Sequence, residues 1–294
     1  MDYQTIRVTP VASCLGARID GMDLSAPLST EQVEELHGAL LEHLVVFLPG
    51  QTIDDDRQIA LAQTFGEPHP HPVGAFLGDQ SLMGSVSTDD YRPGVDSNFH
   101  TDYTFHHEVP DVAVLRAVVV PEHGGDTMWA NTCAAYDALS EPMRAFLDGL
   151  DAFHSQGSTF NDIVIARFGE EAGRPILEAF PGTTHPVVTT HPETGRRNLF
   201  VNEGYTQSIV GLTPSESDAL LRYLFAHIKN SRFTCRYRWS PGDVAIWDER
   251  ATVHVGEGAY WPEQRLMRRV TIGSATPKRA STSSPQTSRV LLKQ

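Results

Sequence analysis

The first residues that could do chemistry are a histidine and an aspartate two positions apart, in His100-Thr101-Asp102. On an extended segment, residues i and i+2 point to the same side, so both side chains can reach one metal ion. One imidazole and one carboxylate form a mixed nitrogen and oxygen donor set that suits Fe(II), Mn(II) or Zn(II). The spacing alone is weak evidence, because a chain with 13 histidines among 294 residues contains such pairs by chance.

A third ligand and two anion-binding side chains follow later in the chain. His254 offers a second imidazole, and Arg265 and Arg269 stand eleven and fifteen positions after it. If this segment is a strand, Arg265, Met267 and Arg269 share one face, and two guanidinium groups line the metal cavity. Arginine is the side chain best shaped to bind a carboxylate or a sulfonate through two hydrogen bonds. The pattern therefore predicts a metal beside a dicarboxylate cosubstrate and a second anion.

Several motifs, taken together, are far more specific than the histidine-aspartate pair. They are Phe99-His100-Thr101-Asp102-Tyr103-Thr104-Phe105; Gly124-Gly125-Asp126-Thr127-Met128-Trp129; Thr184-His185-Pro186-Val187-Val188; His191-Pro192-Glu193-Thr194-Gly195-Arg196; and Trp247-Asp248-Glu249-Arg250 with His254. With the spacing of Arg265 and Arg269, the chain resembles the taurine dioxygenase and 2,4-dichlorophenoxyacetate dioxygenase family. The resemblance extends in the family's order from about residue 8 to residue 273.

The resemblance implies a mainly β chain of the α+β class, with a double-stranded β-helix (jelly roll) core and helical insertions. It implies that His100, Asp102 and His254 hold Fe(II) and are the catalytic metal ligands. It also implies that Thr127 and Arg265 bind the distal carboxylate of 2-oxoglutarate, whose 2-oxo acid end chelates the iron. Three protein ligands leave two positions for the 2-oxo acid and one for O2. The expected reaction oxidises, typically hydroxylates, a C–H bond and releases succinate and CO2.

Six residues are expected to form the substrate pocket: His71, Gly74, Asp96, Phe160, Tyr205 and Arg269. In taurine dioxygenase, a histidine in a His-Pro-Val-Tyr segment and the second arginine hold the anion, and His71 and Arg269 match them. Gly74 replaces the tyrosine of that segment and should enlarge the pocket. Asp96 replaces an asparagine and adds an acceptor for an amine or hydroxyl. The predicted substrate is therefore a small organic anion larger than taurine: a sulfonate, sulfate ester, phosphonate or carboxylate.

Short strands must position these residues. Apolar and polar residues alternate over 233–239, which predicts a half-buried strand, and a turn at 240–243 leads into another strand at 244–247. Segments 187–190 and 198–201 flank a turn near 193–195 and predict a hairpin. The strands are numerous and the helices are irregularly placed, which predicts a sheet-on-sheet core with helices packed outside it.

Three helices are indicated by their capping residues. Ser29 and Gln32 form a capping box before an apolar stripe that extends to residue 44. A second helix is predicted at 55–65. A third begins at Thr213, with Pro214 at the first helical position and Glu216 completing a second box, and extends to about residue 229.

Composition excludes several classes of function. The net charge of −14 argues against a nucleic-acid partner, and no apolar run is long enough to predict a membrane span. Three scattered cysteines and no signal peptide predict a cytoplasmic protein with reduced thiols. We expect a single jelly-roll dioxygenase domain over 1–276 and a flexible tail over 277–294, which is rich in Ser, Thr, Lys and Arg. A homo-oligomer is typical of the family.

Two other interpretations use the same residues. A zinc hydrolase with the same three ligands would need neither 2-oxoglutarate nor O2. A non-enzymatic jelly-roll protein would hold an anion on the two arginines without turnover. Thr127 and Arg265, in the positions that bind the cosubstrate, favour the dioxygenase.

Overall fold

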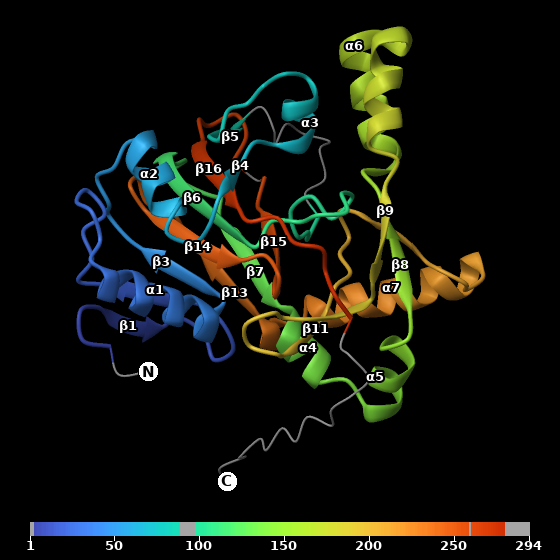
Figure 1. Cartoon of the computed structure of the whole chain (residues 1–294), viewed down its shortest axis with the longest axis horizontal. Helices are drawn as coiled ribbons and strands as arrows, with labels where there is room; N and C mark the ends of the chain where they lie inside the picture. The colour runs from blue at the N-terminus through green and yellow to red at the C-terminus, as the bar shows by residue number, and fades with distance from the viewer. Residues whose placement is uncertain (1–2, 89–97, 259, 280–294) are drawn as a thin grey trace.

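The computed structural model describes residues 3–88, 98–258 and 260–279 (Figure 1). Its largest unit is an eight-stranded sheet in which all neighbours are antiparallel except β2 and β3. Along the sheet, the strands are β1 (Arg7–Pro10), β2 (Ala17–Asp20), β3 (Val45–Leu48), β14 (Val244–Asp248), β6 (Val112–Val119), β16 (Leu266–Ile272) and β4 (Pro68–His69), with β5 (Gly84–Ser87) also paired to β16.

The central strands of this sheet are buried on both faces. In β3, Val46 and Leu48 pack on one side, while Val45 and Phe47 pack on the other. All four side chains are essentially inaccessible to water. Since successive side chains of a strand point to opposite faces, a continuous apolar segment is what a sheet covered on both sides requires.

Two helices cover the outer face of the large sheet, α1 (Thr30–His43) and α2 (Asp55–Ala62) (Figure 1). The predicted capping box of Ser29 and Gln32 is confirmed. The second helix ends at Ala62, three residues earlier than predicted. Gln58 of α2 is fully buried and donates hydrogen bonds to the backbone oxygens of Val114 and Arg268, which fixes the helix to β6 and β16.

A second sheet packs on the inner face of the first. It contains β13 (Thr234–Tyr237), β7 (Thr127–Asn131) and β15 (Thr252–Gly256) in that order. Trp129 of this sheet meets Trp247 and Phe47 of the large sheet at ring-centroid distances of 5.7 and 5.5 Å. The predicted sheet-on-sheet core is therefore confirmed, and large aromatic side chains fill the space between the layers.

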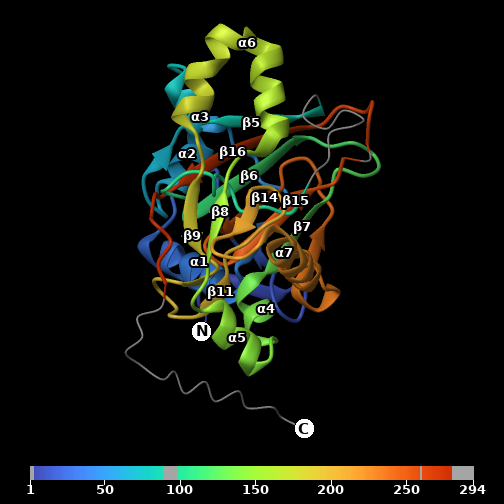
Figure 2. The same cartoon turned by 90° about the vertical axis from the view of Figure 1, so that its right-hand side faces the viewer.

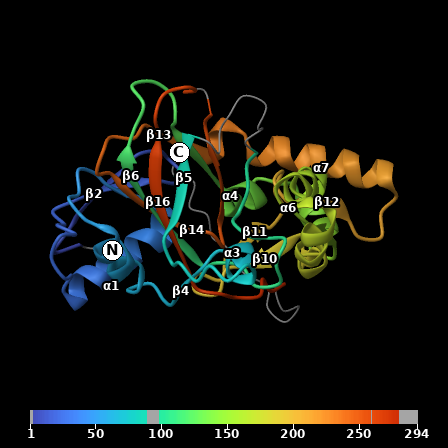
Figure 3. The same ribbon diagram turned by 90° about the horizontal axis from the view of Figure 1, so that it is seen from above.

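The other elements are α3 (Pro72–Phe76), α4 (Thr132–Asp137), α5 (Glu141–Leu147), β8 (Asp151–His154), α6 (Gly157–Ala179), β9 (Thr183–Pro186), β10 (Val188–Thr190), β11 (Arg197–Leu199), β12 (Thr206–Ile209), α7 (Pro214–Ile228) and the 3-10 turn η2 (Ser231–Phe233). Most of them lie on the side of the molecule away from α1, where Figure 3 shows α4, α6, α7 and β12. The predicted hairpin is β10 paired with β11, and the capping box of Thr213 and Glu216 starts α7 as predicted. Figure 2 shows α6 as two limbs projecting from the body, and its helical dihedral angles break at Gly169.

The packed part of the chain reaches Arg279. The backbone oxygen of Lys278 accepts a hydrogen bond from the backbone N–H of Thr190 at 2.9 Å, and Arg279 pairs with Asp151 at 2.6 Å. The first three residues of the predicted tail are therefore held against the domain, and 280–294 lie outside the described residues. No helix in the described part of the chain is long and apolar enough to cross a bilayer. All three cysteines are free thiols, as expected.

Candidate active site

Backbone pairing brings the predicted metal ligands together. The N–H of His100 donates to the oxygen of His254 at 2.9 Å, and the N–H of His254 donates to the oxygen of His100 at 2.7 Å. The Thr101 hydroxyl donates to the backbone oxygen of Thr252 at 2.7 Å, which attaches the segment to β15 a second time. The two imidazole rings consequently lie with centroids 4.3 Å apart.

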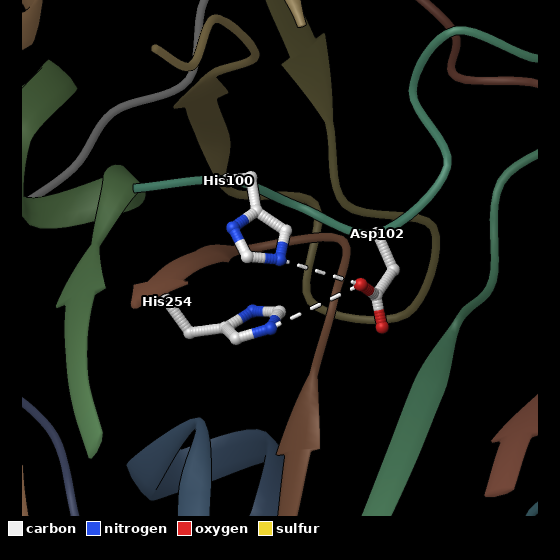
Figure 4. A group of neighbouring side chains, drawn as sticks. All are labelled: His100, Asp102 and His254. Atoms are coloured by element: carbon white, nitrogen blue, oxygen red, sulfur yellow. Dashed lines mark ion pairs between the residues drawn. The ribbon is translucent and has the colours of Figure 1, made fainter. Parts of the chain in front are cut away.

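The three side chains converge on one point (Figure 4). Oδ1 of Asp102 lies 3.6 Å from Nε2 of His100 and 3.9 Å from Nε2 of His254. The other ring nitrogen of His100, Nδ1, donates to the backbone oxygen of Asn98 at 2.8 Å, so its Nε2 is free to face a metal. In the described part of the chain, this is the one group of three such residues that could hold a metal ion.

The ionisation states suit metal binding. Burial alone would raise the pKa of Asp102, but Arg269 and the two imidazoles outweigh burial and hold that pKa well below its usual range. Burial and the neighbouring His100 lower the pKa of His254 well below its usual value. A charged carboxylate and a neutral imidazole are the forms that bind metals. Two histidines and one carboxylate on one face, with open positions opposite, are the donor set of non-haem Fe(II) oxygenases, so the residues fit Fe(II).

Glu249 supports the ligands, and sequence reasoning assigned it no role. Its side chain is 1% exposed. It accepts hydrogen bonds from the backbone N–H of Asp102 at 3.1 Å and from the Trp247 indole at 2.7 Å. Oε1 also lies 4.0 Å from Nδ1 of His254. Burial and the nearby Asp102 raise the pKa of Glu249 well above its usual range. The side chain therefore holds the backbone of Asp102 from behind, and its carboxylate lies near His254.

A cavity of about 50 Å³ adjoins the metal ligands. His100 and His254 line it, and so do Thr127 and Arg265. The Thr127 hydroxyl oxygen accepts from the Trp239 indole at 3.0 Å, which leaves its hydrogen available to donate into the cavity. The two residues predicted to bind the cosubstrate thus line the same cavity as two of the predicted metal ligands.

The Gly-Gly segment explains how Arg265 is held. Arg265 is 4% exposed, and its Nε donates to the backbone oxygen of Gly125 at 3.1 Å. Gly125 has φ +70°, and a Cβ there would lie 3.1 Å from both Cδ and Nε of Arg265. A larger residue would therefore be strained and would press against the arginine side chain. The Arg265 backbone N–H donates to the Thr88 hydroxyl at 2.7 Å, which fixes the start of β16.

The predicted alternation of the arginine strand agrees with the structure. Arg265 and Arg269 both line the cavity, and Met267 packs in the core between the sheets. Arg268 points the other way and forms an ion pair with Asp55 of α2. Arg269 lies 3.0 Å from Oδ2 of Asp102 and donates to the Tyr103 hydroxyl oxygen at 3.1 Å.

The remaining predicted pocket residues are placed as follows. His71 caps α3, and its Nδ1 accepts from the backbone N–H of Val73 at 3.2 Å. A Cβ on Gly74 would meet His71 and Asp79 at 3.7 and 3.8 Å, so this glycine faces its own turn. Asp96 lies outside the described residues. Phe160 belongs to α6, and its side chain is outside what the structure describes.

Tyr205 lies against a metal ligand. Its ring meets the ring of His100 edge-on at 6.0 Å. The preceding Gly204 allows this approach, because a Cβ there would lie 2.8 Å from Cβ of His100. Phe105 packs beside these rings: its ring centroid lies 5.3 Å from that of Tyr205 and 6.2 Å from that of Tyr103. Sequence reasoning assigned no role to Tyr103 or Phe105, although both belong to the motif that contains His100.

A buried polar network holds the same segment from behind. The Thr104 hydroxyl contacts Nδ1 of His154 at 3.1 Å and accepts from the Asn202 amide at 3.1 Å. His154 is fully buried, and burial together with His185 lowers its pKa to about 3. A neutral imidazole therefore belongs to the folded structure.

Comparison with known proteins agrees with this geometry. The model of the family described as "Taurine catabolism dioxygenase TauD, TfdA family" matches residues 7–271. The chain is 39% identical to an alpha-ketoglutarate-dependent sulfate ester dioxygenase of Pseudomonas putida, over 92% of this chain and 90% of that protein. It is 34% identical to an alkylsulfatase of Acinetobacter baylyi, over 92% of this chain and 85% of that protein.

A solved structure shares the whole fold. A taurine dioxygenase from Burkholderia xenovorans superposes with a TM-score of 0.78 at 34% identity, covering 93% of each chain. The jelly-roll architecture and the metal-ligand geometry therefore agree with the sequence relationships. The chain belongs to the TauD/TfdA family and is an alpha-ketoglutarate (2-oxoglutarate)-dependent dioxygenase.

Proposed function

We propose that the enzyme oxidises a C–H bond of a small organic anion, with Fe(II) on His100, Asp102 and His254 and with 2-oxoglutarate and O2 as cosubstrates. One observation carries the proposal: Thr127 and Arg265 line the same 50 Å³ cavity as two of the metal ligands. A dicarboxylate that chelates a metal through one end needs a cation and a donor at its other end. Those two side chains supply both.

Bound iron supplies the oxidising chemistry, which converts 2-oxoglutarate and O2 into succinate and CO2 and inserts one oxygen atom into the substrate C–H bond. The protein's own residues bind, orient and exclude water. Arg265 and Thr127 fix the distal carboxylate of the cosubstrate. The apolar walls of the cavity, including Leu115 and Trp247, keep water out and strengthen the ion pair inside.

We propose an alkyl sulfate ester as the substrate class. The sulfate ester dioxygenase and the alkylsulfatase among the relatives support this class. Arg269, which lies against Asp102 and Tyr103, is the arginine that we assign to the sulfate. Oxygen insertion at the carbon that bears the sulfate gives a hydroxylated ester, which collapses to an aldehyde and hydrogen sulfate. The atoms balance, because the second oxygen of O2 ends in succinate.

The test is a product balance on the purified protein. Fe(II), 2-oxoglutarate, O2 and a linear alkyl sulfate should give succinate, aldehyde and sulfate in equal amounts. Taurine and aryloxyacetates, assayed in parallel, should be poorer substrates. Sulfate and alcohol formed without O2 would indicate a metal hydrolase and contradict the proposal. Succinate formed at the same rate with or without every anion in the panel would contradict the substrate class.

A further inference from the structure

The ring of Tyr260 lies against the arginine that we assign to the cosubstrate. The guanidinium carbon of Arg265 stands over this ring, 5.7 Å from its centroid. Both residues are buried, Tyr260 with 3% and Arg265 with 4% of its surface exposed. A guanidinium over an aromatic ring is attracted by the negative face of the ring, and the attraction is stronger where water is excluded. The segment between β15 and β16 therefore supplies a buried aromatic partner for Arg265.

The turn that carries Tyr260 is anchored at two points. The backbone oxygen of Tyr260 accepts from the N–H of Glu263 at 2.8 Å, and the Glu263 carboxylate accepts from the backbone N–H of Glu122 at 2.9 Å. The Thr88 hydroxyl donates to the Glu263 backbone oxygen at 3.0 Å and accepts from the N–H of Arg265 at 2.7 Å. The turn and the start of β16 thus share an anchor, so the same backbone contacts place the ring and the guanidinium.

An aromatic ring restrains the arginine without using its N–H groups. A guanidinium binds a carboxylate through two N–H groups in its own plane, whereas the ring attracts the positive charge through its face. Nε of Arg265 already donates to the backbone oxygen of Gly125 at 3.1 Å. An acidic side chain at position 260 would compete for the N–H groups that a cosubstrate carboxylate needs. An aromatic partner therefore suits an arginine that must be held in place and still bind an incoming anion.

We propose that Tyr260 is a positioning residue for the cosubstrate: its ring holds the Arg265 guanidinium in the orientation that binds the distal carboxylate of 2-oxoglutarate. The inference rests on the proposed function, which assigns Arg265 to that carboxylate, and adds the residue that preorganises the arginine. The arginine side chain has several rotatable bonds, so without the ring its guanidinium would also populate other orientations. The apparent affinity for an anion falls in proportion to the fraction that is competent to bind.

The experiment compares two 2-oxo acids on Mn(II)-loaded protein without O2, which allows no turnover. 2-Oxoglutarate and 2-oxopentanoate are titrated by calorimetry into wild type and Tyr260→Leu. 2-Oxopentanoate has the same metal-chelating end but carries a methyl group in place of the distal carboxylate. Tyr260→Leu should weaken 2-oxoglutarate binding about fivefold to thirtyfold, the factor that corresponds to a buried cation–π contact. It should leave 2-oxopentanoate binding unchanged, because that acid has no carboxylate for Arg265.

Two further variants and one control separate the ring from the rest of the turn. Tyr260→Phe keeps the ring and should bind 2-oxoglutarate as wild type does. Tyr260→Met is a second variant without a ring and should behave like Tyr260→Leu, with circular dichroism as the check on the fold. Trp261→Leu is the matched control, because it removes a larger ring from the same turn, and Trp261 is 44% exposed. The control should leave both affinities unchanged.

Several outcomes would overturn the proposal. Equal 2-oxoglutarate affinity in Tyr260→Leu and wild type would show that the ring does not position Arg265. Equal loss of both 2-oxo acids, or loss of the native fold in both variants without a ring, would show that Tyr260 only supports the structure. A loss in Tyr260→Phe as large as that in Tyr260→Leu would assign the effect to the hydroxyl. If Arg265→Ala bound 2-oxoglutarate as wild type does, the proposed cosubstrate site would fail and this inference with it, whereas the other outcomes leave that site intact.

Discussion

Replacing Arg265 by alanine tests the cosubstrate site most directly. The side chain is 4% exposed and lines a cavity of about 50 Å³, so a carboxylate bound there depends on this buried guanidinium for its countercharge. A buried carboxylate without its partner costs about 3–5 kcal/mol. Since each 1.4 kcal/mol is a factor of ten, Arg265→Ala should weaken 2-oxoglutarate binding more than a hundredfold.

The assay is calorimetric titration of 2-oxoglutarate into Mn(II)-loaded protein without O2. Arg268→Ala is the matched control, because the neighbouring arginine lies on the opposite face of β16 and pairs with Asp55. It should leave the cosubstrate affinity unchanged, although it removes the same charge. Thr127→Val should weaken binding by about 1–3 kcal/mol, the value of one hydrogen bond to a charged group.

The 2-oxoglutarate affinities of the two arginine variants can contradict the assignment in two ways. If Arg265→Ala and Arg268→Ala gave the same 2-oxoglutarate affinity as wild type, the cavity beside the metal would not be the cosubstrate site. If both variants lost affinity equally, the effect would come from net charge. Arg265→Lys adds a second check, since it keeps the charge but lacks the planar fork that binds a carboxylate through two hydrogen bonds.

Three further predictions follow from the site. Alanine at His100, Asp102 or His254 should abolish Mn(II) binding in calorimetry while the circular dichroism spectrum stays native; retained binding by Asp102→Ala would contradict the ligand assignment. Gly204→Ala should weaken Mn(II) binding, because its Cβ would lie 2.8 Å from Cβ of His100 and displace that ligand; unchanged metal affinity would contradict this contact. The pKa of His154 is about 3 in the folded protein and about 6.5 when unfolded, so stability falls as pH drops through that window. Urea unfolding should show a loss of about 2 kcal/mol from this group between pH 7 and pH 5, which His154→Gln should remove; equal pH slopes would refute it.

Local sequence signals predicted the elements whose cause is local. The capping boxes at Ser29 and Thr213 fix two helix starts because the side chain and the orphan N–H lie three residues apart. The alternation of Arg265, Met267 and Arg269 is also a local signal, because every second side chain of a strand points to the same face. Local signals did not predict α6, whose 23 residues contain Gly169 and Pro175, residues that normally interrupt a helix.

The site was predictable where residue type alone carries the chemistry. Two imidazoles and a carboxylate form a metal donor set whose spacing alone is weak evidence, and the two arginines and the surrounding motifs made the prediction specific. Glu249 and Tyr103 join the site only through tertiary contacts: Glu249 meets the backbone of Asp102, and Tyr103 meets Arg269. Such partners come from segments far apart in the chain, so no spacing rule could reveal them. For Gly74, an added Cβ meets the neighbouring turn instead of open space.

Strand register explains why two anion sites can serve one metal. Arg265 immediately precedes β16 and Arg269 lies within it, so their backbones are separated by roughly 13 Å at about 3.3 Å per residue. Both line the cavity beside the predicted metal ligands; we assign Arg265 to the cosubstrate and Arg269 to the substrate. A slip of one residue would turn both away from the cavity and bring Arg268 inward.

Contacts on the other face of the strand oppose that slip. Asp55 of α2 forms an ion pair with Arg268, and Gln58 donates to the Arg268 backbone oxygen at 2.8 Å. Next to Arg265, the pairing with β6 shifts register between Leu266 and Met267. The extra residue of this irregularity is Val118, in β6. The contacts of α2 on the outer face thus oppose a slip of β16 and keep Arg269 on the cavity side of the strand.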